Sequence, residues 1–141
     1  MKRVHGLISI LLFFLAVGIA AWTVFQSSAL YGWLYLVVTV LGTLGIVYSF
    51  CCKCCSKHQC SHIILGMMAK KMPKRPVGKY TKWDVVGMAS SFFAVVAFPQ
   101  VWLWSYLYHA LLFWALALFI VWEIAHHVCP SCKNTLCPLH T

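Results

Sequence analysis

Acidic side chains are almost missing from this chain, whose 141 residues include only Asp84 and Glu123. Charged residues make up 9% of the chain, where a soluble domain would carry roughly a quarter. Because 62% of the residues are hydrophobic, there are too few polar side chains to cover a soluble globule. Reactions that need paired carboxylates in one chain, such as glycoside hydrolysis, are excluded. Glycine-rich phosphate loops, H-E-x-x-H and nucleophile elbows are also missing, so we expect a non-enzymatic protein.

Long apolar runs take the place of the missing charge. A helix needs about 20 apolar residues to cross the hydrocarbon core of a membrane. The last apolar stretch, residues 85–128, is about twice that length, and Pro99 interrupts it because proline lacks the backbone donor that a helix interior needs. We therefore predict an all-α membrane protein with four transmembrane helices in two hairpins, over residues 6–25, 30–50, 83–101 and 105–128. The first run is too long for the apolar core of a signal peptide, so we expect an uncleaved helix.

The basic residues fix an orientation for these four helices. The net charge is +9, and all eleven basic residues fall on the side that carries both termini and the central loop. By the positive-inside rule this side is cytoplasmic, so both termini of an integral inner-membrane or plasma-membrane protein are expected in the cytoplasm. The basic residues are Lys2, Arg3, Lys53, Lys57, Lys70, Lys71, Lys74, Arg75, Lys79, Lys82 and Lys133.

The chain divides into three parts. Residues 1–62 are the first hairpin with a cysteine-rich end, residues 63–82 are a basic cytoplasmic linker, and residues 83–141 are the second hairpin with its tail. We expect the linker to lie against anionic lipid headgroups. Its basic residues already determine topology, so no nucleic-acid partner is expected.

Two clusters of cysteine and histidine follow the second and fourth predicted helices. The tail has the spacing C-x2-C-x4-C-x2-H, and three cysteines of the central loop repeat C-x2-C-x4-C at a constant offset, with a histidine behind them. This offset indicates a possible tandem repeat of a two-helix unit. Three thiolates and one histidine form the shell of structural zinc sites, and a reducing cytoplasm disfavours disulfides. The predicted zinc ligands are Cys129, Cys132, Cys137 and His140 in the tail, and Cys52, Cys55, Cys60 and His62 in the loop.

Three other roles remain open for the thiols. Cysteines just inside a membrane helix and beside lysines are also a pattern for S-acylation, which fits Cys51, Cys52, Cys54 and Cys55. Thiols near the loop's methionines are suited to Cu(I) or another soft metal; these are Met67, Met68 and Met72. The pair Cys129 and Cys132 has the spacing of a redox dithiol.

Glu123 is the only acid inside a predicted span, and an acid in a membrane is a candidate functional residue. His126 and His127 follow it at helical spacing, so Glu123 and His126 form a possible intramembrane site. The alternative is an ordinary ion pair with Arg3, Lys82 or a histidine. Asp84 is expected to cap the third helix. Small residues at helical spacings predict close helix packing; they are Ala16 and Ala20, Gly42 and Gly45, and Gly87 and Ser91.

The sequence therefore predicts a structural or accessory subunit of a membrane complex, with zinc-binding knuckles in the cytoplasm. The alternative is a protein that handles or transports metal ions through its thiols and Glu123, and a second alternative is a membrane thiol redox protein. Expected partners are the lipid bilayer and either other membrane subunits or a cytoplasmic protein. A homo-oligomer is also compatible with the sequence.

Overall fold

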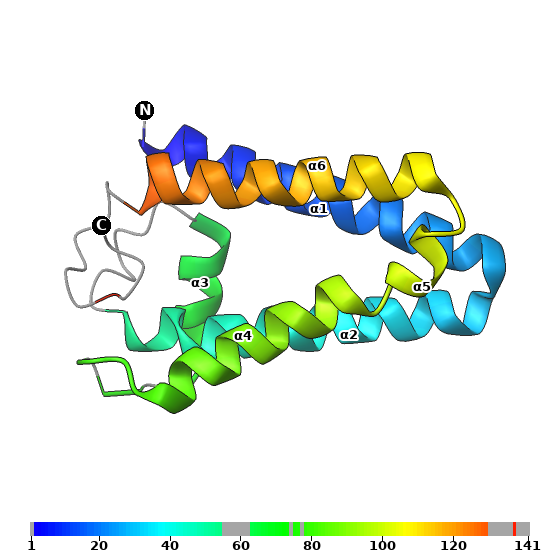
Figure 1. Ribbon diagram of the computed structural model, residues 1–141. Coiled ribbons are helices and arrows are strands. Elements are labelled where there is room, and N and C mark those ends of the chain that lie inside the picture. Colours follow the sequence, from blue (N-terminus) through cyan, green and yellow to red (C-terminus); the bar gives the residue numbers. More distant parts are fainter. Residues whose placement is uncertain (1, 55–62, 74, 77, 130–136, 138–141) are drawn as a thin grey trace.

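The computed structural model describes residues 2–54, 63–73, 75–76, 78–129 and 137 (Figure 1). Every element within these residues is helical, which confirms the all-α prediction. In chain order the elements are α1 (Lys2–Ser27), α2 (Ala29–Ser49), η1 (Cys51–Lys53), α3 (Ile63–Lys71), α4 (Lys82–Ala97), α5 (Gln100–Leu103), α6 (Leu107–Glu123) and η3 (Ile124–Val128).

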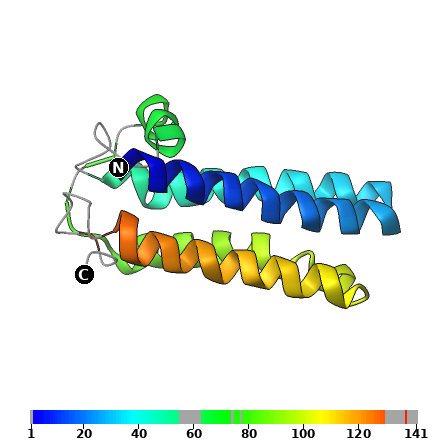
Figure 2. The same ribbon diagram turned by 90° about the horizontal axis from the view of Figure 1, so that it is seen from above.

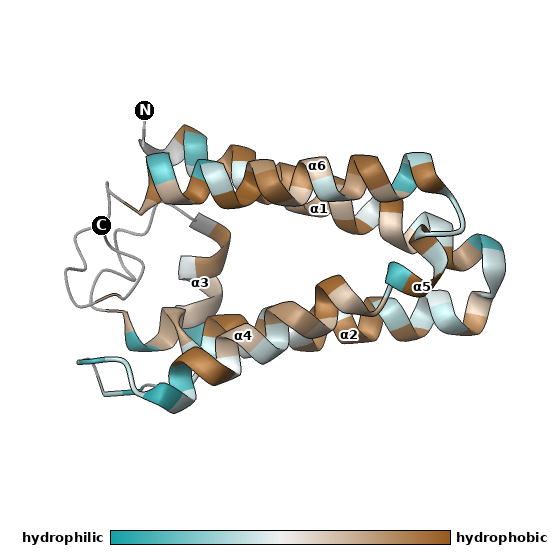
Figure 3. Cartoon of the chain, in the orientation of Figure 1, coloured by the Kyte–Doolittle hydropathy of each residue, from teal (hydrophilic) through white to brown (hydrophobic). Residues whose placement is uncertain are grey.

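Within the described part of the chain, four helical segments are long and apolar enough to cross a membrane, as predicted. Large apolar side chains project outward along them, for example Leu11, Phe14, Leu41 and Phe93. Hydrophobic residues cover the long helices, while hydrophilic residues gather near their ends (Figure 3). Such a surface is stable only against lipid, so these helices imply a bilayer environment. The four segments are Val4–Ser27, Ala29–Lys53, Lys82–Leu103 and Leu107–Val128.

Each long helix packs closely against at least one other long helix. Helix α1 packs against α2 and α6, and α2 packs against α4 (Figures 1 and 2). Figure 2 shows α1 and α2 in one layer and α4 and α6 in the other. Because α6 packs against α1, these contacts do not confirm the second predicted hairpin.

Small residues allow these close approaches, as the sequence predicted. On α1, Ala16 and Ala20 are buried in a cluster with Ala110 and Phe113 of α6. Between α2 and α4, a side chain on Gly42 would lie 3.1 Å from the backbone oxygen of Ser91. Lipid provides no hydrophobic driving force for helix association. Van der Waals contact between closely approaching backbones stabilises the helix pair instead.

Pro99 bends the chain but does not reverse it. The residue has a helical backbone, with φ −76° and ψ −8°, and the amide of Leu103 donates to its carbonyl at 2.9 Å. Proline is accepted at the start of a helical turn because no amide is needed there. The short helix α5 follows, the chain turns at residues 104–106, and α6 begins two positions later than predicted.

The seam between α2 and α4 gives a first prediction. We expect Gly42→Leu to lower the free energy of unfolding by about 1–3 kcal/mol, because the new side chain meets backbone that cannot move aside. The measurement is reversible unfolding of the purified protein in mixed micelles.

The matched control is Gly18→Leu, because nothing lies within 4 Å of a Cβ at that position. The control should unfold like the wild type or slightly later. Equal loss of stability in both variants would contradict the close packing of α2 on α4.

Candidate functional site

Polar chemistry gathers at one end of the bundle. The beginning of α1 lies there, as do the end of α2, the beginning of α4 and the end of η3 (Figure 1). We call this region the thiol end and define it by residues 51–54, Asp84, Glu123 and Cys129. Both acids of the chain and four of the described cysteines therefore belong to one region.

Asp84 is the most enclosed charge of the thiol end, with only 1% of its side chain exposed. One carboxylate oxygen lies 2.7 Å from Nζ of Lys53, and the other lies 2.9 Å from Nη1 of Arg75. Lys53 is itself buried, with 9% of its side chain exposed. Two cations from two separate segments thus share one carboxylate.

The local sequence explains why Asp84 stands at this point. Thr81 is the N-cap of α4, and its amide and hydroxyl both donate to the Asp84 carboxylate, at 2.7 and 2.8 Å. The Asp84 amide donates back to the Thr81 hydroxyl at 3.4 Å. This reciprocal capping box begins the helix. Asp84 takes part in the cap as predicted, but it does so from the first turn of α4, and the N-cap residue is Thr81. The negative charge also suits the positive end of the helix dipole.

Aromatic rings hold the two cations in place. The Arg75 guanidinium lies 4.9 Å from the ring centre of Tyr48, and its Nη1 donates to the Tyr48 carbonyl at 3.4 Å. Nζ of Lys53 lies 6.0 Å from the ring centre of Tyr80, whose hydroxyl donates to the Phe50 carbonyl at 3.3 Å. The linker before α4 is therefore fastened to the end of α2.

Glu123 forms a second polar cluster, at the junction of α6 and η3. Its side chain is 6% exposed, and Oε1 lies 2.7 Å from Nδ1 of His5 on α1. Its other oxygen lies 3.8 Å from Nε2 of His127. The rings of His5 and His127 are stacked, with centres 4.6 Å apart and planes 11° apart. One buried carboxylate therefore faces two imidazoles, and its contact with His5 joins α1 to α6.

Of the two histidines after Glu123, His127 is the one that faces the acid. Both rings also lie near the ring of Trp122, with centres 5.5 Å away for His126 and 5.4 Å for His127, so the contact with Glu123 is what separates the two histidines. The segment Ile124–Val128 is a π-helical turn, which is wider than an α turn. In this wider turn, His127 lies nearer than His126 to the face of the helix that carries Glu123.

The predicted zinc ligands are only partly within the described residues. Cys52 is 1% exposed and packs against α3, and Cys129 follows η3, where its amide donates to the Ile124 carbonyl at 2.8 Å. Cys137 is half-buried. The remaining predicted ligands lie outside the described residues; they are Cys55, Cys60, His62, Cys132 and His140. Within the described ranges, no group of three or more histidine, cysteine or acidic side chains is arranged to hold a metal ion, so both knuckles stay predictions.

Sequence reasoning missed several polar contacts of this end. It did not pair Asp84 with Lys53 and Arg75, and it did not single out His5 as the partner of Glu123. The signals were present in part. The T-x-x-D pattern at Thr81 is a capping box, and a lone acid in a very basic chain is expected to attract cations. Nothing in the sequence identifies which of the basic residues come close.

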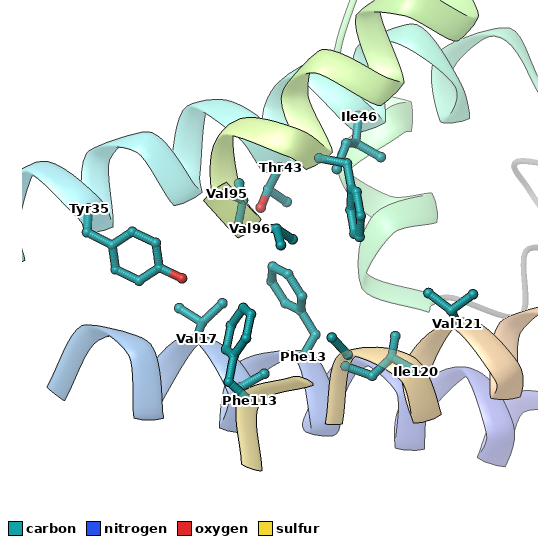
Figure 4. A pocket seen from close by; sticks show the side chains of 13 residues that line it. Phe13, Val17, Tyr35, Thr43, Ile46, Val95, Val96, Phe113, Ile120 and Val121 are labelled. Carbon is teal, nitrogen blue, oxygen red and sulfur yellow. The ribbon is translucent and has the colours of Figure 1, made fainter. Parts of the chain in front are cut away.

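A cavity of about 60 Å³ lies between the two pairs of helices (Figure 4). Its walls are aliphatic and aromatic, apart from the hydroxyl groups of Tyr35 and Thr43. No histidine, cysteine, acid or basic residue is among the residues that line it.

Comparisons with protein-family models, curated proteins and solved structures found no match to this chain.

The buried ion pairs give a second prediction. We expect Asp84→Asn to lower the free energy of unfolding by about 3 kcal/mol or more, because Lys53 is left buried without a negative partner. The measurement is thermal or denaturant unfolding in detergent, at the same pH for each variant.

The control is Lys79→Gln, which removes an exposed charge of the same linker. An exposed charge contributes at most about 1 kcal/mol, so this variant should unfold close to the wild type. An Asp84→Asn protein as stable as the control would rule out Asp84 as the point that joins these segments.

Proposed function

We propose that this chain is a small, non-enzymatic membrane protein that binds zinc at its cytoplasmic thiol end and serves as an accessory or docking subunit of a membrane complex. One observation carries the proposal. One cysteine cluster follows α2 and the other follows η3. The last residues of these two elements lie at the same end of the bundle (Figure 1). Both clusters are therefore attached to the chain at the same end of the helical bundle.

Charge supports a cytoplasmic position for this side. The described basic residues lie at the beginning of α1, in η1, in α3, in the linker and at the beginning of α4; they are Lys2, Arg3, Lys53, Lys70, Lys71, Arg75, Lys79 and Lys82. Positive charge of this density is retained on the cytoplasmic side of membranes. The exposed lysines at the end of α3 would also bind anionic lipid headgroups.

Ligand chemistry supports zinc at the tail. Cys129, Cys132, Cys137 and His140 make a Cys3His set with the short spacings of structural zinc sites. Zinc with three thiolates and one neutral histidine has a net charge of −1, which the surrounding lysines would offset. The binding free energy of the metal would order the tail against the membrane and create a surface for a partner. That partner is another membrane subunit or a cytoplasmic protein, and a second copy of the chain would serve equally.

A second candidate function, the handling of metal ions, is favoured by the cluster around Glu123. A buried acid that faces two histidines is unusual in an apolar helix, and such residues mark ion or proton pathways in membrane proteins. In this case the thiols would receive or release the ion. Uptake of metal by vesicles that contain the protein, abolished by Glu123→Gln, would favour this function over a structural one.

Elemental analysis tests the zinc proposal. We expect at least one zinc per chain in protein purified without chelators, and its loss in Cys132→Ser, because a tetrahedral site lacking one of its thiolates binds zinc far more weakly. The control is Ser131→Ala, the neighbouring tail residue that is not a proposed ligand.

The outcome separates the candidates. A second zinc per chain would give the loop set Cys52, Cys55, Cys60 and His62 the same role. Protein that contains no zinc before and after incubation with the metal would refute the proposal. If the tail thiols then cycle between a dithiol and a disulfide, the redox alternative replaces it.

Topology gives another prediction. A fluorescent protein fused after Thr141 should fluoresce, because that reporter folds on the cytoplasmic side, and alkaline phosphatase inserted after Ser28 should be active on the other side. Active phosphatase fused after Thr141 would invert the orientation and remove the cytoplasmic proposal. A phosphatase fusion in the linker, after Gly78, serves as the inactive control.

A further inference from the structure

A buried pair of sulfur atoms lies between η1 and α3. Sγ of Cys52 is 3.7 Å from Sδ of Met72, and it is 3.8 Å from the carbonyl oxygen of Ala69. Cys52 is 1% exposed and belongs to a small apolar core with Val47 and Ala69. The thiol is thus directed into the protein, toward the methionines of α3.

A second thioether accompanies the pair. Met68 lies one helical turn before Met72, whose amide donates to the Met68 carbonyl at 3.2 Å. Residues four apart share one face of a helix, and both methionines pack against the core that contains Cys52. Met67 lies on another face and is 51% exposed. Met72 contacts the Cys52 thiol and Met68 packs against the same core, whereas Met67 is exposed.

The separation of the sulfur atoms suits a shared metal ion. Sulfur ligands lie about 2.3 Å from a bound metal, so two of them on one ion stand roughly 3.8–4.0 Å apart in tetrahedral or trigonal geometry. The observed 3.7 Å between Cys52 and Met72 needs almost no rearrangement. Thiolate and thioether sulfur are the soft ligands that select Cu(I).

Charge selects a monovalent ion. One thiolate and two neutral thioethers balance a single positive charge, so a Cu(I) complex is neutral and suits an apolar core. A divalent ion with the same ligands would leave a net positive charge buried without a partner, which is costly. Neighbouring Lys53 is paired with Asp84, which it shares with Arg75.

We propose that Cys52, Met68 and Met72 form a binding site for one Cu(I) ion. On binding, the Cys52 thiol releases its proton to solvent, the thiolate and the two thioethers each donate a lone pair to the metal, and no group changes its oxidation state. The site uses none of the tail ligands, so it stands or falls separately from the proposed zinc site. A Cu(I) ion bound to Cys52 would exclude this residue from a zinc site in the loop.

The test compares two substitutions of equal size in the full-length chain, purified in detergent without oxygen. Cu(I) affinity is measured by competition with the chromophoric chelator bicinchoninate. We expect Met72→Leu to weaken Cu(I) binding by about tenfold or more, because even outer-shell changes at metal sites cost roughly 10–100-fold. Met67→Leu should bind like the wild type. Leucine fills nearly the same volume as methionine, so neither change should disturb the core.

Other thiols of the chain also bind Cu(I), so the two substitutions are repeated in a chain whose other seven cysteines are replaced by serine. This chain should bind one Cu(I), and Met72→Leu should weaken that binding while Met67→Leu does not. If the serine-substituted chain does not fold, the comparison of Met72→Leu with Met67→Leu in the native chain is the test. Equal Cu(I) affinity of Met72→Leu and Met67→Leu in every folded background would refute the site and leave Cys52 and Met72 as core packing. Zinc content should be unchanged by Met72→Leu, which separates this result from failure of the tail site.

Discussion

The shared carboxylate of Asp84 is the contact on which the thiol end depends. Lys53 follows α2 directly and is buried, and a buried cation that loses its partner costs about 3–5 kcal/mol. Asp84 supplies that partner from the first turn of α4 and binds Arg75 of the linker as well. The end of α2 and the start of α4 are therefore joined. The position of η1, on which α3 packs, follows from that junction.

The only two acids of the chain have parallel roles. Asp84 joins α2 to α4, and Glu123 joins α6 to α1 through His5. These are also two of the helix pairs that pack closely, through Gly42 in one case and Ala16 and Ala20 in the other. Packing of small residues brings two helices together but allows them to slide along one another. A single polar contact at one end fixes the register, because a buried charge has no equivalent position one turn away.

The sequence was sufficient for the properties that depend on one helix at a time. Apolar length predicted four spans, glycine and alanine spacing predicted close approaches, and Asp84 was recognised as a cap. Properties that depend on two distant segments were beyond it. His5 and Glu123 meet although they are separated by almost the whole chain, and no local pattern encodes that meeting. The choice of His127 over His126 was also beyond the sequence, because both histidines follow Glu123 at helical spacing.

The ion pairs at the thiol end also affect its sulfur chemistry. Cys52 and Lys53 are neighbours in one short helix, so fixing the ammonium on Asp84 restricts where the adjacent thiol can lie. With α3 packed over η1, the Cys52 thiol and the Met72 thioether are already close before any ion arrives. Ligands that are held in place lose little conformational freedom on binding, which strengthens the complex. The buried pair of Lys53 and Asp84 can in this way raise the affinity of the proposed Cu(I) site, although it does not contact the metal.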